Sequence, residues 1–482
     1  MEKLLKLLLA FTICLLCHFA SAQAQHYDYF QANRLMIRNG VQAVLTCNGL
    51  FTSNRSIEQV FAQELAYLSY PLGDFEGGHY TISRKIKAVS VGGGEDGVII
   101  TAVFRRGIGC VVMAPDQGLS DIASLPVSEH TALVANTAQV LWPIGDKLPD
   151  IPLPDNVKRK SLKAASDWAF TRNTPEQDTL SLLIVHKGQI IHERYASGID
   201  KNTRTRIWST AKSIAVTLIG MLVDKGLMDL DAPLGIEWLP QQADIEADVR
   251  AKITLRHVLN MSSGLYPVDS YKMEYATGSG LSYWVGASSV DGARARALTR
   301  EPGAVWDYEN YDTLLAVYAM KLALGSDKDY QIFPYKALLQ PLGMNSTLLG
   351  TDRFGDYVMS SQVYSNARDL ARFGLLYQQN GIWRGERLLS EEWINFVRTP
   401  APASERHHRF YGAQWWLVPD NRRDIPKDAY STSGNRGQFV IVVPSHDLVI
   451  VRRGLDYGKQ GFDRWDLTRE VLKAFSPSDN SK

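Results

Sequence analysis

The chain has 482 residues, of which 45% are hydrophobic, and its 52 basic side chains almost balance its 51 acidic ones. This length and composition predict a globular protein with two domains, or with one large domain and an extension. The near-neutral charge excludes the strongly basic surface that is typical of nucleic-acid-binding proteins.

The N-terminus has the three parts of a secretory signal. Two lysines precede an apolar stretch, residues 7–17, and Ala20-Ser21-Ala22 forms a small-x-small cleavage site. The apolar stretch is shorter than the roughly 20 residues that a membrane-spanning helix requires. We therefore predict a signal peptide over residues 1–22, with cleavage after Ala22 or Ala24. The mature protein is expected in the periplasm or outside the cell, without stable insertion in the membrane.

Two of the four cysteines, Cys14 and Cys17, would leave with the signal. Cys47 and Cys110 remain, and an even number of cysteines in an oxidising compartment predicts a disulfide between them. Two buried free thiols are the alternative. Neither cysteine belongs to a zinc-binding pattern, so no metal site is predicted.

A proline-rich connector over residues 149–155 divides the chain. Residues 23–150 are predicted to form an N-terminal extension domain, which is a lid, a docking surface or a stabilising element. Its expected elements are a helical segment, 57–69, and strands at 85–91, 98–104 and 109–113.

Residues 151–482 form the second predicted domain, with a strand hairpin near each end and a helix-rich middle. This order favours an α+β fold in which an antiparallel sheet is covered by terminal helices and stands beside an all-helical region. The predicted elements are helices at 161–170, 209–225 and 463–475, and hairpins at 181–195 and 437–453.

Ser209 and Lys212 stand three residues apart at the start of a predicted helix, so they lie on the same face. The lysine amine can take the proton of the serine hydroxyl, and the helix N-terminus offers unpaired N–H groups to an oxyanion. The pair predicts an activated serine nucleophile. The alternative is a solvated serine and lysine on an ordinary amphipathic helix.

Four stretches of the second domain resemble the serine β-lactamase and penicillin-binding-protein superfamily, in particular its class C-like esterase and 6-aminohexanoate-dimer hydrolase branch. They are residues 208–213, 253–264, 301–310 and 340–344. The resemblance spans about residues 160–475. It implies a serine hydrolase that acts on a small ester or amide through an acyl-enzyme, with no metal or organic cofactor.

The second element of this family is a Tyr-x-Asn motif, for which the sequence has two candidates. The motif at 364–366 is followed by an acidic residue in the spacing of a helix N-cap, which is a structural role. We therefore assign Tyr308 as the second proton carrier, with its phenolate favoured by the lysine ammonium. Asn310 is predicted to hold Lys212 or a substrate carbonyl.

Thr432-Ser433-Gly434 matches the third element of the family. By this resemblance Ser433 and Gly434 line the substrate site, and the N–H of Asn435 completes an oxyanion hole with the N–H of Ser209. Thr432 stands where β-lactam and D-Ala-D-Ala hydrolases have a cation for the carboxylate of their substrate, which argues against penicillin hydrolysis. Arg436 is predicted to bind this anion from another side, with pairing to a surface acid as the alternative.

Trp306 and Tyr266 are predicted to wall the pocket, and core packing is the alternative for both. The sequence therefore predicts an exported serine esterase or amidase. One alternative is a D,D-carboxypeptidase, D-aminopeptidase or β-lactamase that acts on peptidoglycan-like substrates. Another is a ligand-binding module of the same fold without catalysis. The substrate and the oligomeric state are not predicted.

Overall fold

The computed structural model describes residues 30–69, 72, 77–128, 137–241, 248–269, 274–408 and 410–475. The predicted signal peptide lies outside these residues. Helices and antiparallel sheets alternate along the chain, which confirms the predicted α+β class.

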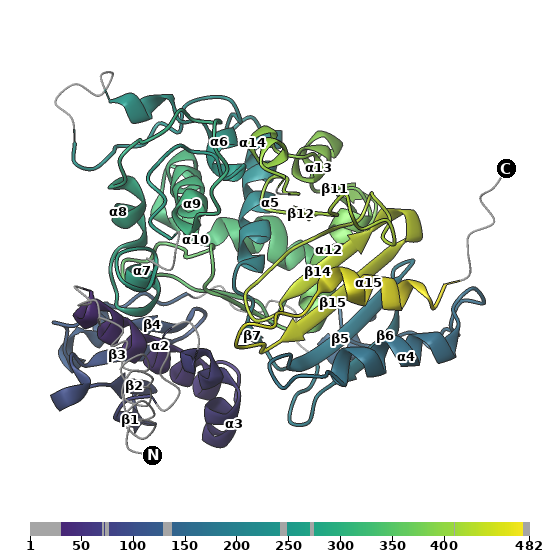
Figure 1. Ribbon diagram of the computed structural model, residues 1–482, viewed down its shortest axis with the longest axis horizontal. Coiled ribbons are helices and arrows are strands. Elements are labelled where there is room, and N and C mark those ends of the chain that lie inside the picture. Colours follow the sequence, from purple (N-terminus) through teal and green to yellow (C-terminus); the bar gives the residue numbers. More distant parts are fainter. Residues whose placement is uncertain are drawn as a thin grey trace, which may run out of the picture.

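The N-terminal region, residues 30–128, packs one long helix against a small antiparallel sheet (Figure 1). Its helices are α2 (Gln31–Phe51), α3 (Ile57–Ala62) and the 3₁₀ helix η1 (Glu64–Ser69). Its strands, in the spatial order β1-β2-β3-β4, are β1 (Tyr80–Ser83), β2 (Ala88–Val91), β3 (Ile100–Arg105) and β4 (Gly109–Val112).

A disulfide joins helix α2 to strand β4, as the sequence predicted. The sulfur atoms of Cys47 and Cys110 are 2.04 Å apart, and they close a loop of 63 residues. Beside this link, the backbone N–H of Cys110 donates a hydrogen bond of 3.0 Å to Asn48 Oδ1. The disulfide and the hydrogen bond together hold the helix on its sheet. The disulfide also stabilises the fold, because the closed loop has fewer conformations in the unfolded state.

A six-stranded antiparallel sheet forms the second part of the molecule, in the order β12-β13-β14-β15-β5-β6. Its central strands are buried along their whole length, since both faces are covered. The strands are β5 (Thr179–His186), β6 (Gln189–Tyr195), β12 (Trp416–Leu417), β13 (Tyr430–Ser431), β14 (Phe439–Val443) and β15 (Leu448–Gly454).

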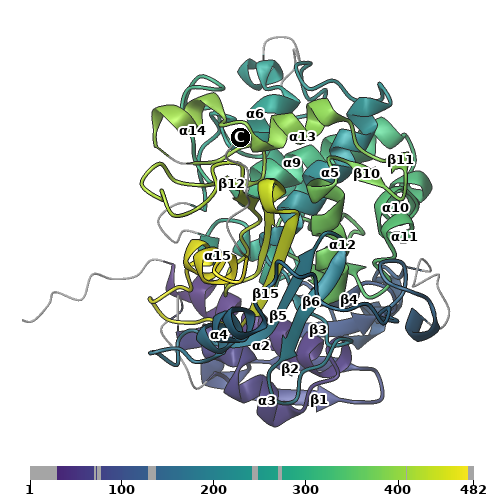
Figure 2. The same cartoon turned by 90° about the vertical axis from the view of Figure 1, so that its right-hand side faces the viewer.

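Helices cover the two faces of this sheet. The terminal helices α4 (Arg159–Phe170) and α15 (Arg464–Leu472) lie together on the outer face (Figure 2). Helix α12 (Ala367–Gln378) packs on the inner face, between the sheet and the helical region. The predicted sheet with terminal helices over it is therefore present.

The helical region stands above the N-terminal region and beside the sheet, with α5 (Thr210–Asp224) at its centre. Helix α5 is buried almost throughout, because apolar residues surround its whole circumference. The other helices are α6 (Leu255–Leu259), α7 (Gly280–Trp284), α8 (Ser289–Arg294), α9 (Asn310–Leu324), α10 (Asp327–Pro334), the π-helical η7 (Tyr335–Leu339), α11 (Gln340–Leu342), α13 (Glu391–Arg398) and α14 (Pro402–Arg406).

Two minor sheets complete the fold. Strands β7 (Thr205–Arg206), β9 (Val363–Ser365) and β8 (Leu348–Leu349) pair in that order, and β10 (Ile382–Trp383) pairs with β11 (Glu386–Arg387). Strand β7 matters most for function, because it leads directly to the start of α5.

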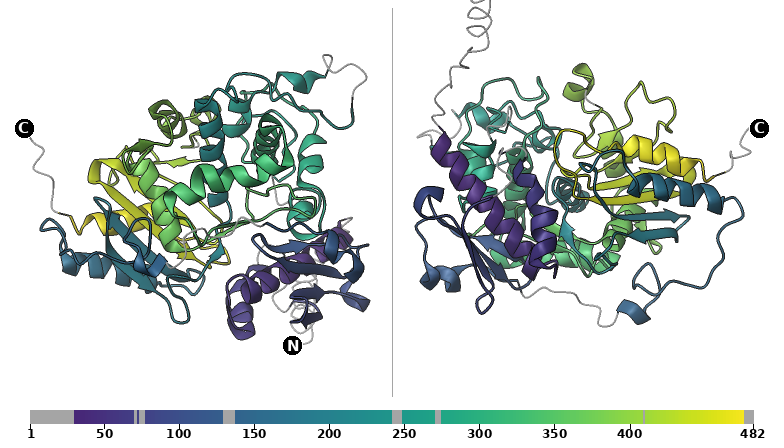
Figure 3. Two further views of the ribbon diagram at one scale, coloured as in Figure 1. Left: turned by 180° about the vertical axis from the view of Figure 1, so that it is seen from behind. Right: turned by 60° about the horizontal axis from the view of Figure 1, so that its bottom comes forward.

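One hydrophobic core extends from the N-terminal region into the helical region. It includes Val44 of α2, Tyr67 of η1, Trp208, Ile214 of α5 and Trp284 of α7. Figure 3 shows α2 and α3 packed along this side of the molecule. Among the described residues, no helix has the combination of length and apolarity that crossing a bilayer demands.

Candidate active site

Ser209 occupies the N-cap position of α5, at the end of a sharp turn from strand β7. The preceding residue, Trp208, makes this turn with a positive φ of 50°, which is rare for a residue with a Cβ. The turn places the serine hydroxyl at the N-terminus of a buried helix, where the helix dipole favours negative charge.

Lys212 lies one turn further along α5, and its amine reaches three oxygen atoms. Nζ donates hydrogen bonds to Asn310 Oδ1 at 2.7 Å and to the carbonyl of Ser360 at 2.8 Å. The third oxygen is Ser209 Oγ, 3.1 Å away. A neutral amine has two N–H groups and one lone pair. The two carbonyl acceptors take the N–H groups, so the lone pair can face the serine hydroxyl.

Burial lowers the pKa of Lys212 to about 7. The carboxyl groups of Asp269, Glu274 and Glu309 oppose this shift, and the guanidinium of Arg206 adds to it. Removing an ammonium group from water disfavours its charged form, so the amine is neutral in a large part of the molecules near neutral pH. A lysine in this state is a competent general base.

The reaction of Ser209 is expected to depend on pH through this group. Below the pKa of Lys212 the amine is protonated and cannot accept the serine proton, so the rate should rise about tenfold per pH unit and level off above pH ~7. The measurement is the rate at which a fluorophosphonate labels Ser209 between pH ~5 and ~9. A rate that is constant over this range, or that falls as the pH rises, would contradict the assignment of Lys212 as the base.

Tyr308 stands on the other side of Ser209. A side-chain hydrogen bond joins its hydroxyl to Ser209, and its ring centroid lies 5.1 Å from Nζ of Lys212. Burial raises the pKa of Tyr308 above its ordinary value, so the phenol form is favoured. The expectation that the lysine would favour a phenolate is therefore wrong, because desolvation of the hydroxyl outweighs the hydrogen bond from Ser209 and the charge of Arg464. Tyr308 is placed to donate and relay a proton.

Asn310 is the first residue of α9 and holds Lys212, one of the two predicted roles. Its Nδ2 donates to Ser279 Oγ at 3.0 Å, and its backbone N–H donates to Asp269 Oδ2 at 3.2 Å. These bonds fix the orientation of the amide that binds Lys212. The second Tyr-x-Asn motif has the structural role that the sequence predicted, since the side chain of Asn366 caps α12 by accepting the N–H of Asp369.

The predicted third element lies beside the nucleophile. At Gly434 an added Cβ would come within 2.2 Å of the carbonyl oxygen of Ile207, so only glycine allows this approach. Within the part of the chain that the structure describes, the backbone N–H groups of Ser209 and Asn435 have no hydrogen-bond acceptor. They are available to an oxyanion. Thr432 is buried and hydrogen-bonds to Thr210 Oγ1 at 3.0 Å.

Arg436 does not face the site as a substrate cation. Its three guanidinium nitrogens donate to the backbone carbonyls of Gln63, Glu64, Leu455 and Asp456 at 2.7–2.9 Å. Arg436 is 4% exposed. The anion-binding role predicted for Arg436 is therefore corrected, because the guanidinium is bound by four backbone carbonyls, two of them in the N-terminal region.

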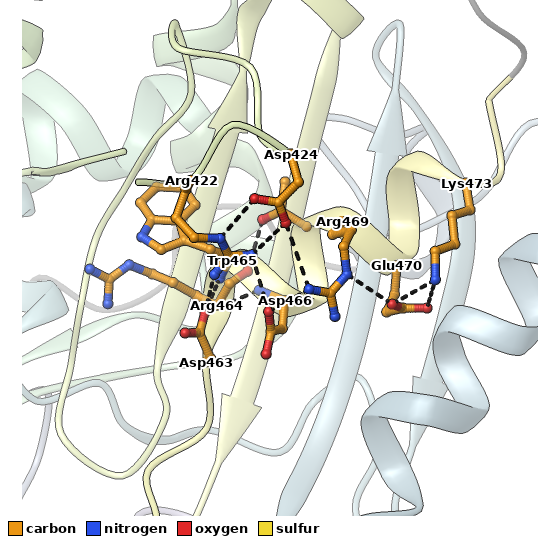
Figure 4. A network of polar contacts seen from close by, with 10 residues as sticks. Arg422, Asp424, Asp463, Arg464, Trp465, Asp466, Arg469, Glu470 and Lys473 are labelled. Carbon is orange, nitrogen blue, oxygen red and sulfur yellow. Dashed lines mark hydrogen bonds and ion pairs between the residues drawn. The ribbon is translucent and has the colours of Figure 1, made fainter. Parts of the chain in front are cut away.

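Arg464, at the start of α15, is the cation that the sequence did not predict. Its Nη1 donates to Ser433 Oγ at 3.3 Å, while its Nε is buried without a partner. No described carboxylate forms an ion pair with it. Figure 4 shows its guanidinium directed away from the surrounding ion-pair network. Burial lowers the pKa of Arg464 to about 10, with Asp463 and Tyr308 acting against this shift, so it stays charged near neutral pH.

Aromatic rings form one wall of the site. The rings of Trp306, Tyr308, Tyr411 and Trp416 pack on one another, with centroids 5.5 Å apart for Trp306 and Tyr411 and 5.7 Å for Tyr308 and Trp416. Trp306 thus lies beside Tyr308, and its contact with a substrate stays a prediction. Tyr266 is 54% exposed and makes no ring contact with this group.

Several side chains of the site carry no local signal in the sequence. Arg464 is one of several charged residues around an ordinary helix N-cap, and Trp416 lies in an apolar run. Ser360 contributes only its carbonyl, and Tyr283 fixes Ser360 by a hydrogen bond of 2.6 Å between their hydroxyls. Residues such as these join the site only through tertiary packing.

A protein-family comparison assigns the fold. The family model described as Beta-lactamase matches residues 170–460, which is more than half of the chain. The chain therefore belongs to the β-lactamase family, in the superfamily of serine β-lactamases and transpeptidases that the motifs resemble. It is a hydrolase of that superfamily.

The chain is similar to several characterised and uncharacterised proteins. It is 24% identical over 296 residues to the 6-aminohexanoate-dimer hydrolase of Paenarthrobacter ureafaciens, which covers 58% of this chain and 72% of that protein. It is 23% identical over 318 residues to an uncharacterised protein of Alkalihalophilus pseudofirmus, covering 59% of this chain and 86% of that protein.

Similar solved structures include a family VIII carboxylesterase, with a TM-score of 0.49, 16% identity, and coverage of 66% of this chain and 98% of that one. A D-stereospecific amidohydrolase from Streptomyces has a TM-score of 0.46 and 18% identity, and covers 67% and 99% of the two chains.

Proposed function

We propose that the protein is an exported serine hydrolase of the class C-like branch, which cleaves a small ester or amide through an acyl-enzyme on Ser209. The observation that carries this proposal is the position of the Lys212 amine. It has two carbonyl acceptors for its N–H groups and lies 3.1 Å from Ser209 Oγ. The disulfide supports export, since such bonds persist in oxidising compartments.

In the proposed acylation, Ser209 Oγ attacks the carbonyl carbon while its proton moves to the neutral amine of Lys212. The N–H groups of Ser209 and Asn435 stabilise the negative oxygen of the tetrahedral intermediate. The bond to the leaving group then breaks, and the leaving group takes a proton from the phenol of Tyr308. The ammonium of Lys212 restores that proton to Tyr308, so the amine is neutral again.

Deacylation reverses these roles. Water attacks the acyl carbon, and one of its protons passes through Tyr308 to Lys212. The ester bond to Ser209 breaks, and Ser209 Oγ recovers the proton from Lys212. The products are the free acid and the resting enzyme, and every proton is accounted for by Ser209, Lys212 and Tyr308.

The test is labelling of the mature protein with a fluorophosphonate, together with turnover of a panel of p-nitrophenyl esters. Labelling of Ser209, located by peptide mass spectrometry, and hydrolysis of at least one ester are expected. A folded protein that neither labels nor turns over any ester or amide would favour the alternative, a ligand-binding module of the same fold.

A second candidate function is hydrolysis of an amide or ester that carries a carboxylate, such as a peptide with a free C-terminus. Arg464 favours it. A partly buried guanidinium without a counter-ion carries a desolvation cost, which is offset when an anion binds. Nη1 of Arg464 already points to Ser433 in the third element, so the guanidinium and the hydroxyl together suit a carboxylate.

Arg464→Gln should therefore separate charged from neutral substrates. For the mono-p-nitrophenyl ester of glutaric acid, kcat/KM should fall about 10- to 100-fold, the size expected for a lost charge-assisted hydrogen bond. For p-nitrophenyl butyrate it should change less than about 2-fold. Arg469→Gln, on the same helix but in an ion pair with Asp466, is the matched control and should leave both values unchanged. An equal loss for both esters would contradict anion binding by Arg464.

A further inference from the structure

The two residues that flank the oxyanion donors both have a left-handed backbone. Trp208, before Ser209, has a φ of 50°, and Arg436, after Asn435, has a φ of 61°. Residues with a Cβ rarely adopt this conformation, and it persists only when surrounding contacts hold it. The position of each donor N–H therefore depends on what packs against its neighbour.

Two of the four carbonyls that hold the Arg436 guanidinium belong to the N-terminal region, and the other two are those of Leu455 and Asp456. Nη1 donates to the carbonyl of Glu64 at 2.9 Å, and Nη2 donates to the carbonyl of Gln63 at 2.7 Å. The carboxylate of Glu64 lies 3.5 Å from Nη1 as well. Glu64 is the first residue of the 3₁₀ helix η1, and Gln63, the C-cap of α3, immediately precedes it. Since the guanidinium is rigid and planar, its bonds fix the backbone next to Asn435.

The same short helix holds Trp208. The ring of Tyr67, in the middle of η1, packs on the Trp208 ring with centroids 4.9 Å apart, and both side chains are buried. The Arg436 guanidinium lies 5.9 Å from the centroid of the Tyr67 ring. One turn of η1 thus contacts the neighbours of both donors. Figure 1 shows β7, which leads to Trp208, on the side of the sheet that faces the N-terminal region.

Helix η1 is itself fixed in place. Arg55 donates to Glu64 Oε1 at 2.8 Å with both side chains buried, and the hydroxyls of Tyr67 and Tyr275 are hydrogen-bonded. Each of these contacts comes from a different segment of the chain. The helix is therefore a rigid support and not a loose connection.

We propose that η1 positions both halves of the oxyanion hole. Tyr67 acts on the N–H of Ser209 through the Trp208 ring, and Arg436 links η1 to the backbone next to the N–H of Asn435. This inference rests on the proposed function, and it gives the N-terminal region a part in catalysis. The negative oxygen exists in the transition state and not in the bound substrate. Misplaced donors should therefore lower kcat and leave KM nearly unchanged.

The experiment compares Tyr67→Leu, Tyr67→Phe and Arg436→Lys with the wild type. Tyr67→Leu and Arg436→Lys should lower kcat about 10- to 100-fold at a KM within about 2-fold, since one oxyanion donor contributes about 10²- to 10³-fold. The Ki of an arylboronic acid, which forms a tetrahedral adduct with the serine, should rise by the same factor as kcat falls. Tyr67→Phe keeps the ring on Trp208 and should stay close to the wild type.

Val60→Ala is the matched control, because it makes a cavity in the same region, where Val60 is buried in α3 against Gly49. It should lower the melting temperature without changing kcat or the boronate Ki. Folded variants of Tyr67 and Arg436 with wild-type kcat and Ki would overturn the proposal, as would an equal effect of Val60→Ala. Failure of the proposed function would differ, since the wild type itself would then neither label nor hydrolyse esters.

Discussion

Replacement of Ser209 by alanine is expected to abolish fluorophosphonate labelling and to reduce ester turnover on the order of 10⁴- to 10⁶-fold. Ser209 Oγ is the only protein atom in the proposed mechanism that forms a covalent bond to the substrate. The remaining activity would come from the oxyanion donors and substrate binding alone. The measurement is single-turnover hydrolysis of a p-nitrophenyl ester, with intact-mass analysis of the labelled protein.

Ser213→Ala is the matched control for this result. Ser213 lies one turn further along α5, is buried, and donates a hydrogen bond of 2.7 Å to the carbonyl of Gln414. Its loss should cost about 1 kcal/mol of stability and leave labelling intact. Turnover that persists in Ser209→Ala would show that another group is the nucleophile.

Replacement of Lys212 by methionine is expected to lower kcat/KM about 10³- to 10⁴-fold, because the general base is lost while the length of the side chain is kept. The pH dependence centred near the lysine pKa should also disappear, since no other group in the mechanism titrates there. Stopped-flow measurement of acylation across the pH range tests both effects.

Lys225→Met provides the comparison for Lys212→Met. Lys225 is the exposed C-cap of the same helix and makes no contact with Ser209, so its replacement should leave the rate and its pH dependence as in the wild type. A Lys212→Met protein that retains the wild-type pH profile would require a different base. Circular dichroism of both variants would show that the helix is still formed.

The elements that the sequence predicted best are those whose local pattern and tertiary environment agree. The sequence predicted a strand in the second half of the hairpin at 181–195, and β6 spans Gln189–Tyr195. The apolar runs at both ends of the second part became β5, β14 and β15, because helices cover both faces of the sheet. Ser209 and Lys212 were predictable for a similar reason, since their spacing alone brings them together on a helix.

Helix α2 shows why other elements were missed. It contains Gly40, Gly49 and three asparagines, which are poor helix formers. In the structure, two of these residues make close contacts with distant segments of the chain. Asn39 Nδ2 donates to the carbonyl of Val98 at 3.0 Å, and Gly40 lies where a Cβ would be 1.9 Å from the carbonyl oxygen of Trp284. Tertiary packing overrides local propensity here.

The two arginines illustrate the same limit at the site. Arg436 is adjacent to the third element in sequence, yet it faces the N-terminal region, and Arg464, 28 residues later, reaches Ser433. The direction of a side chain is decided by what packs around it. The sequence shows that arginines stand at 436 and 464, but it does not show which way their side chains point.

The shared hydrophobic core has a consequence for any shortened form of this protein. Tyr67, Trp208 and Trp284 belong to one continuous cluster, and Gly40 brings the backbones of α2 and α7 into direct contact. A chain that began at the proline-rich connector would expose the rings of Trp208 and Trp284 to water. Such an apolar face favours self-association. The N-terminal region and the region that carries Ser209 should accordingly unfold in a single cooperative thermal transition.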